Sequence, residues 1–442
     1  MLGYGYPLES LRRGLARGVS FIGVDAGSTD PGPYYLGSGQ GFVKPRQVRR
    51  DLEHALLAAR GQRIPLIVGS AGGSGARPHV DAFLEILGEI ARERALHFRL
   101  AVIRADVPKD VVIRALNEGR TAPCGPLPEL TEEAVRSCTH LVGQMGTDPF
   151  LRALHAGADV VVAGRACDTA IFAALAIRGG FDPGLALHLA KIAECGALCA
   201  RPEGANDGLL GTLRGDHFLV EPASAQRACT PDSVAAHSLY EQPDPGCFHE
   251  PEGKVDLTGC RFDAVDERTV MVTGSRLVPN GRRTVKLEGA ALRGYRAVTI
   301  AGIRDPLAIA HLPEIEEGVR QAVAGNLRGV IEASAYSLRF LRYGLDGVMG
   351  PAEPPALHPP REVGLVVDVV APTQDLAETI LSLARATALH QSFPGRKSTA
   401  GNLAFPFSPS DLSAGAVYEF AVYHLLEGED PAVLFPVEIR EV

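Results

Sequence analysis

Three short apolar runs, each followed at once by a loop of small and polar residues, constrain the fold of this chain most. The runs are Phe21–Val24, Ile64–Val68 and Asp159–Ala163. Helical patterns separate them, and a further apolar run, Leu100–Ile103, lies between the second and the third. Short continuous apolar strands that alternate with helices are typical of a parallel sheet with helices on both faces. The sequence therefore predicts an α/β fold.

The alternation of strand and helix extends to about residue 205, after which the pattern changes to alternating strand-like runs, turns and two long helical patterns. We expect an N-terminal α/β domain of residues 1–205, with a mostly parallel sheet and helices on both faces. An α+β domain of residues 206–442 follows, with a proline-rich linker at about 349–360. The order of the strands stays open, and a doubly wound sheet is favoured over a partial barrel.

The charge balance excludes several classes of partner. The 442 residues carry a formal net charge of −8 with no basic block, and they include no Trp. We therefore expect no nucleic acid and no membrane among the partners. Residues 1–7 lack the features of a signal peptide, and no apolar stretch is long enough to span a bilayer. These features favour a cytoplasmic protein whose eight cysteines are reduced thiols.

The loop after the first strand holds two carboxylates and two hydroxyls close together. Asp25 and Asp30 flank a tight turn that can bring their carboxyl groups together and raise the pKa of one of them. We expect them to act as an acid/base pair, with Ser28 and Thr29 contacting the substrate. The same oxygens would alternatively ligate a divalent metal ion, or only stabilise the turn.

A glycine-rich loop, Gly69–Gly75, follows the second strand and precedes a helix. We expect its backbone N–H groups, with Ser70, Gly72 and Gly73, to hold an anion. The alternative is that the glycines let the helix pack closely on the sheet. The loop contains no ATP or NAD motif. His79, just after the loop, is a candidate for proton transfer, although a lone histidine is usually structural.

The third loop places an arginine near an acidic residue. Arg165 suits a carboxylate or phosphate because its planar group binds two oxygens at once. Asp168 and Thr169 follow where a helix begins, and we expect both to contact substrate, with helix capping as the alternative for Asp168. Glu194, in a partly apolar helix, is a further candidate base, and Cys167 is expected to be a packed core thiol.

Two further candidates lie in the second half of the chain. Lys286 shares one face of a predicted strand with Glu288, where the two form an ion pair or reach into the cleft. Asn402 ends a basic loop that would close over an anionic ligand, with a solvated loop as the alternative. Because the carboxyl ends of parallel strands meet at one edge of a sheet, we expect the three strand-end loops to form a crevice for a small anionic substrate.

The chain resembles the acyclic terpene utilisation protein A family, once classed as a domain of unknown function. The matching segments are Gly23–Asp30, Gly69–Gly73, Ala158–Thr169, Val285–Gly289 and Asn402–Pro406. The resemblance covers most of the chain and implies a role beside catabolic genes that handle branched acyl-CoA compounds and other carboxylates. It assigns no residue a catalytic role.

These observations favour a catabolic enzyme, a lyase, hydratase or isomerase, that acts on a small carboxylate or acyl-CoA by carboxylate-assisted proton transfer. The alternatives are a metal-dependent hydrolase with its ion at Asp25 and Asp30, and a non-catalytic subunit of an acyl-CoA or terpene catabolic system. The cofactor stays unknown, with a divalent metal as the alternative to none. We also expect a homo-oligomer, with a small companion subunit as a further partner.

Overall fold

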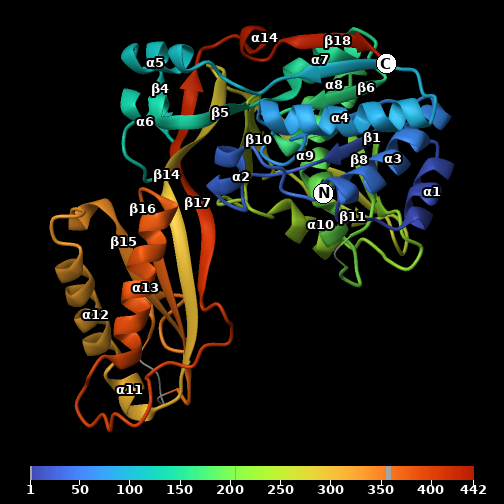
Figure 1. Cartoon of the computed structure of the whole chain (residues 1–442). Helices are drawn as coiled ribbons and strands as arrows, with labels where there is room; N and C mark the ends of the chain where they lie inside the picture. Colours follow the sequence, from blue (N-terminus) through green and yellow to red (C-terminus); the bar gives the residue numbers. More distant parts are fainter. Residues whose placement is uncertain (1, 205, 355–359) are drawn as a thin grey trace. The chain divides into compact units, whose positions relative to one another are not determined.

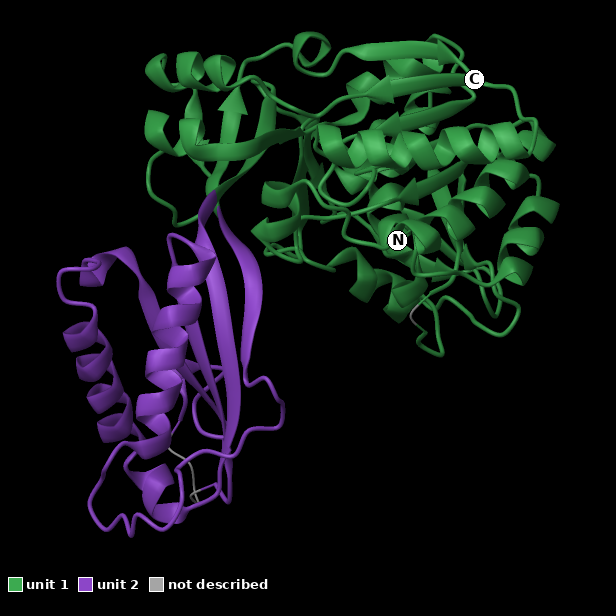
Figure 2. Cartoon of the chain, viewed as in Figure 1, with its two compact units in different colours: residues 1–291, 420–442 green, residues 292–419 purple. Residues whose placement is uncertain are grey.

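The computed structural model describes residues 2–204, 206–354 and 360–442, and the chain forms two compact units (Figures 1 and 2). Unit 1 comprises Met1–Ala291 and Phe420–Val442, and unit 2 comprises Leu292–Glu419. The predicted domain boundary near residue 205 stays a prediction, as does the linker at 349–360, of which residues 355–359 lie outside the described residues.

Unit 1 is built on an open five-stranded sheet. Its strands, in spatial order, are β1 (Ile22–Asp25), β2 (Leu66–Gly69), β6 (Val160–Ala163), β3 (Arg99–Ile103) and β18 (Val437–Glu441). The first four are parallel, and β18 is antiparallel to β3 at the edge. This arrangement confirms the predicted α/β class and supplies the strand order that the sequence left open.

Helices cover both faces of this sheet (Figure 1). Alternate residues of each strand point to opposite faces, so Val68 packs against α3 (Pro45–Gln62) and α4 (Arg77–Glu93), whereas Ile67 packs in the other core cluster. That second cluster contains α7 (Thr147–His155) and α8 (Asp168–Arg178). Shorter helices at the surface of unit 1 are α1 (Leu8–Ala16), α2 (Pro33–Ser38), α5 (Lys109–Asn117), α6 (Glu132–Ser137) and α14 (Pro431–Leu434). Burial on both faces explains why these strands are almost entirely apolar.

A helical hairpin leads from the parallel sheet to the antiparallel part of unit 1. Helix α9 (Pro183–Glu194) packs along α8, so that its last turn lies beside the first turn of α8. Two small antiparallel sheets then follow. One contains β7 (Leu209–Leu213), β8 (His217–Pro222), β12 (Val270–Thr273) and β11 (Arg261–Ala264). The other contains β9 (Cys247–Glu250), β10 (Gly253–Asp256) and β13 (Arg276–Pro279). Helix α10 (Pro231–Ser238) also packs against α9.

The first half of β14 (Thr284–Ile303) completes unit 1, where it pairs with β5 (Cys138–Gln144). The end of β17 (Asp411–Glu427) pairs there with β4 (Thr121–Pro123). The sequence predicts two separate strands near 284–287 and 297–300, but the structure has one continuous strand over both. Gly294 makes this possible, because a Cβ at its φ of +148° would lie 2.5 Å from the Ala371 carbonyl oxygen.

Unit 2 has the element order β-α-β-β-α-β, counting α11 and α12 as one helical segment. Its strands are β14 and β17, which it shares with unit 1, β15 (Ser337–Tyr343) and β16 (Val363–Ala371), in the spatial order β15-β16-β14-β17. The helices are α11 (Pro306–Ala310), α12 (Leu312–Asn326) and α13 (Gln374–His390). Val319 and Ile380 pack from the helices onto Val367 of the sheet. This topology is that of ferredoxin-like folds.

Candidate functional site

The three predicted strand-end loops are neighbours because β1, β2 and β6 are adjacent in the sheet. The Ala26 N–H donates to the Gly69 carbonyl oxygen at 2.9 Å, and the Ser70 N–H donates to the Gly164 carbonyl oxygen at the same distance. The loop after β2 therefore lies between the other two. All three loops belong to unit 1 and meet at the carboxyl edge of its sheet, where ligands bind in folds of this kind.

The glycines of the middle loop serve close packing. A Cβ on Gly27 would lie 2.1 Å from the Gly73 carbonyl oxygen, and one on Gly75 would lie 2.1 Å from the Arg165 nitrogen. A Cβ on Gly72 would lie 2.5 Å from the His79 carbonyl oxygen. This geometry matches the packing interpretation of the loop, and it leaves anion binding by Gly72 and Gly73 as a prediction.

Arg165 forms a buried ion pair with Glu288 of β14. Its Nε donates to Glu288 Oε2 at 2.8 Å and its Nη2 to Oε1 at 3.3 Å, while Nη1 contacts the Ser70 hydroxyl at 3.4 Å. Thr29 also donates to Glu288, at 3.2 Å. Burial alone would raise the pKa of Glu288, but Arg165 and Lys286 hold it at about 2. The guanidinium group is therefore neutralised by a protein carboxylate.

Lys286 lies beside this pair and is partly exposed. Its Nζ is 3.0 Å from Glu288 Oε1 and 4.2 Å from the centre of the Tyr423 ring. The predicted ion pair on one strand face is thus present, and an ammonium group over an aromatic ring gains a further favourable contact. Contact with a substrate stays a prediction for Lys286.

Four carboxyl groups form an acidic cluster next to the Arg165 loop: Asp25, Asp168, Glu194 and Glu250. Asp168 is central, because its charge raises the pKa of each of the other three. Burial followed by Asp168 raises the pKa of Asp25 to about 8 and that of Glu194 to about 9. Burial and then Glu252 raise the pKa of Glu250 to about 8. At neutral pH the cluster thus holds several protons.

The α8–α9 hairpin places Asp168 and Glu194 at opposite kinds of helix end. Asp168 is the first residue of α8, where the helix dipole favours negative charge. Glu194 is the last residue of α9, where the dipole disfavours it. The neighbouring Asp168 carboxyl also raises the pKa of Glu194. Lys191, in the same last turn, donates a hydrogen bond to Glu194 Oε1.

Glu252 has a separate structural role. Its Oε1 accepts hydrogen bonds from the Thr147 N–H at 2.5 Å and from the Thr147 hydroxyl at 2.7 Å. It thereby caps the N-terminus of α7 from another part of the chain. Met145, two residues before Thr147, forms a backbone bridge with Ala166 of the Arg165 loop. The bonds from Thr147 to Glu252 therefore also hold the Glu250–Gly253 hairpin against that loop.

Four predicted residues lie apart from the cluster or are already engaged. Asp30 is exposed and accepts a hydrogen bond from Ser28. His79 is buried, and its Nδ1 accepts from the Ala76 N–H at 3.2 Å while its Nε2 lies 3.0 Å from two backbone carbonyl oxygens. Asn402 belongs to unit 2, where its amide donates to two backbone carbonyls and its oxygen accepts from Arg396.

Sequence reasoning missed Glu250 and Lys191 as members of the site. Lys191 and Glu194 lie three residues apart in one helix, which is a detectable ion-pair spacing. Glu250 and Glu252 flank a proline at a hairpin tip, a pattern that carries no catalytic signal by itself. Cys167 is buried, as expected for a core thiol.

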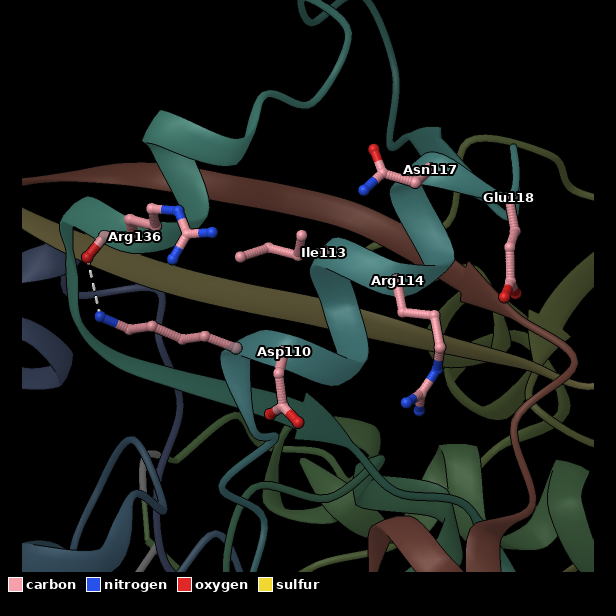
Figure 3. A pocket seen from close by; sticks show the side chains of 7 residues that line it. Asp110, Ile113, Arg114, Asn117, Glu118 and Arg136 are labelled. Atoms are coloured by element: carbon pink, nitrogen blue, oxygen red, sulfur yellow. Dashed lines mark hydrogen bonds between the residues drawn. The ribbon is translucent and has the colours of Figure 1, made fainter.

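A pocket of about 570 Å³ lies elsewhere in unit 1, against α5 (Figure 3). Arg136, Ile113 and Asn117 line it, and Lys109 donates to the Arg136 carbonyl oxygen at 2.8 Å. Asn117 and Arg136 both donate to Glu132, at 3.3 and 3.1 Å. Lys109, Asn117 and Arg136 are thus already paired, and the pocket shares no residue with the acidic cluster.

Within residues 2–204, 206–354 and 360–442, no group of three or more His, Cys, Asp or Glu side chains is arranged to hold a metal ion. The same residues include no helix that is both long and apolar enough to cross a membrane. The site that these residues build is a set of partly buried carboxyl groups at the carboxyl edge of a parallel sheet.

Fold and site together define an α/β protein with an acidic strand-end site and a ferredoxin-like second unit. The family model for "Acyclic terpene utilisation family protein AtuA" matches residues 38–200 and 212–408. The chain belongs to this acyclic terpene utilisation family, which confirms the resemblance seen in the sequence. Asp25 precedes the matched residues, whereas Arg165, Asp168, Glu194 and Glu250 lie within them. Neither the curated proteins nor the solved structures include a significant match to the chain.

Proposed function

We propose that this protein is a catabolic enzyme, a lyase, hydratase or isomerase, whose acidic cluster transfers protons to and from a small acyl substrate. The observation that carries the proposal is the pairing of Asp168 with carboxyl groups whose pKa values lie near 8 and 9. Strongly raised carboxyl pKa values grouped at a ligand-binding edge are a feature of catalytic sites. The family name supports a place in the breakdown of acyclic terpenes.

The chemistry needs an acid and a base at the same time. Removing water from a substrate, or moving a double bond, takes a proton from one atom and supplies a proton to another. Asp168, the first residue of α8, serves as the base in this proposal. Glu194 and Asp25, which keep their protons at neutral pH, serve as acids. Environments that push neighbouring carboxyl pKa values apart assign such roles.

Hydrogen exchange tests this proposal directly. The protein is incubated in D₂O with a panel of acyclic terpenoid acids and their CoA thioesters, and deuterium uptake next to the carbonyl is followed by NMR. We expect the wild type to label at least one member, and Glu194→Gln to slow that labelling by roughly 100-fold or more. Glu133→Gln, an exposed Glu-to-Gln change on α6, is the matched control. Labelling at the wild-type rate in Glu194→Gln and in Asp168→Asn would refute the proposal.

A further inference from the structure

We propose that the acidic cluster binds its substrate through a hydrogen-bond-donating group, a hydroxyl or an ammonium, and that it does not bind a free carboxylate. This inference rests on the proposed function, because it names the part of the substrate that the same site receives. It also revises the expectation of an anionic substrate held by Arg165.

The arginine of the site is already used by a protein carboxylate. Arg165 is 5% exposed and donates two hydrogen bonds to Glu288, which is 0% exposed. Lys191 is 7% exposed and hydrogen-bonded to Glu194, and the charge of the nearby Asp168 contributes to its raised pKa. A substrate carboxylate would have to displace Glu288 to reach Arg165. Breaking a buried ion pair is costly, since it leaves one charge without a partner.

Polar atoms beside these pairs are buried without partners. Asp168 Oδ1 makes no hydrogen bond with any described residue, and neither does Thr169 Oγ1. Thr169 is only 3% exposed. Its hydroxyl faces the Glu250 carboxyl, whose pKa it lowers, without reaching a hydrogen bond of ordinary geometry. Buried polar atoms in native proteins are nearly always hydrogen-bonded, so these two atoms are suited to bind a ligand.

The unpartnered atoms determine the ligand chemistry. A carboxylate oxygen only accepts hydrogen bonds, and a threonine hydroxyl can both accept and donate. A ligand hydroxyl can donate to Asp168 and accept from Thr169 or from a protonated carboxyl of the cluster. An ammonium group can donate to Asp168 and Thr169 together. A ligand carboxylate would bring a further negative charge next to Asp168, which raises the energy of both groups.

A matched series of ligands separates these chemistries. Geraniol, geranylamine and geranate share one acyclic terpene skeleton and differ in the head group, so their apolar contacts with the protein are equal. Binding of each to the intact protein is measured by calorimetry at pH 7. We expect geraniol or geranylamine to bind at least about tenfold more tightly than geranate, because one hydrogen bond to a charged group contributes this much. The tighter of the two identifies the donor as hydroxyl or ammonium.

Two substitutions locate the binding. Asp168→Asn is expected to weaken the favoured ligand about tenfold or more and to leave geranate unchanged or tighter. Thr169→Val removes the second unpartnered atom while it keeps the shape of the side chain, and it gives the same test if Asp168→Asn does not fold. Arg165→Lys is expected to leave the preference among the three head groups unchanged.

Three outcomes would overturn the inference. Tighter binding of geranate than of both donors would do so, as would equal binding of all three. A rise in melting temperature with Mg²⁺ alone that disappears in Asp168→Asn would assign the cluster to a metal ion instead. The readout is binding and not turnover, so it is independent of the hydrogen-exchange experiment. If the protein catalyses hydrogen exchange but shows no preference for geraniol or geranylamine over geranate, the proposed function stands and only this inference is rejected.

Discussion

Arg165 and Glu288 are joined by two hydrogen bonds of 2.8 and 3.3 Å, although 123 residues separate them in the chain. The pair links the loop after β6 to the beginning of β14. Thr29 donates to the same carboxylate, so the loop after β1 is attached to it as well. One buried carboxylate therefore fixes two strand-end loops, and its partner arginine is not free to bind a substrate.

Replacement of this carboxylate should destabilise unit 1. Glu288→Gln leaves the buried Arg165 without a counter-charge, and we expect the free energy of unfolding to fall by roughly 3–5 kcal/mol in urea denaturation. Lys286→Met removes the other cation beside Glu288, but that side chain is 26% exposed. Its loss should cost about 1 kcal/mol or less. Equal losses in the two variants would contradict a central role for the Arg165–Glu288 pair.

The acidic cluster should make stability depend on pH. Asp25 and Glu194 have folded-state pKa values of about 8 and 9. Their unfolded values are about 4, so between these limits the folded protein binds more protons than the unfolded chain. Stability from these groups is complete below about pH 4 and is lost as pH rises through 8 to 9. Each group contributes a slope of up to about 1.4 kcal/mol per pH unit.

Melting curves recorded from pH 5 to pH 9 check this expectation. Asp25→Asn and Glu194→Gln should each flatten the decline in melting temperature, because neither amide titrates. The exposed Glu133→Gln should keep the wild-type slope. A wild-type melting temperature that rises between pH 6 and pH 9 would show that these carboxyl groups are ionised in the folded protein.

The close approach of the strand-end loops predicts a strong effect at Gly75. Gly75 and Gly119 both have a φ of +68°, but a Cβ on Gly75 would lie 2.1 Å from the Arg165 nitrogen and one on Gly119 would have nothing within 4 Å. Gly119→Ala should cost only the left-handed backbone penalty of roughly 1–2 kcal/mol. Gly75→Ala should cost at least about 3 kcal/mol, because it adds a clash with backbone. Similar midpoints of urea unfolding would argue against close packing here.

Asp25 and Asp30 should differ in activity. Asp25 belongs to the acidic cluster, whereas Asp30 is exposed and engaged by Ser28. In the hydrogen-exchange assay Asp25→Asn should lose roughly 100-fold in rate, and Asp30→Asn should lose less than about threefold. A larger loss in Asp30→Asn would restore the acid/base pair that the sequence suggested.

The parallel sheet was predictable because its strands are buried on both faces and therefore appear as continuous apolar runs, such as Ile64–Val68. The adjacency of the three loops follows from the strand order, which sequence patterns do not contain. Strand β18 (Val437–Glu441) was not predicted, and its place beside β3 depends on pairing between segments far apart in the chain. The two strands predicted near 284–287 and 297–300 are one strand, which Gly294 permits to continue.

The candidate site was predictable in part, for a physical reason. Asp25, Arg165 and Asp168 follow strands directly, so their position is set by local structure. Glu250 reaches the same edge through a hairpin that Glu252 attaches to α7, an interaction between segments 105 residues apart. The pairing of Arg165 with Glu288 is equally non-local. Sequence spacing could identify Arg165 as a cation but could not show that its charge is already matched.

The α8–α9 hairpin has a consequence for how this site can change by mutation. Burial and the charge of Asp168 raise the pKa of Glu194, and its place at the end of α9 disfavours the anion further. Exchange of aspartate for glutamate at either position keeps a carboxyl group at the same helix end. In the proposed mechanism, the acid and the base therefore survive such exchanges, whereas an amide at either position removes one of them.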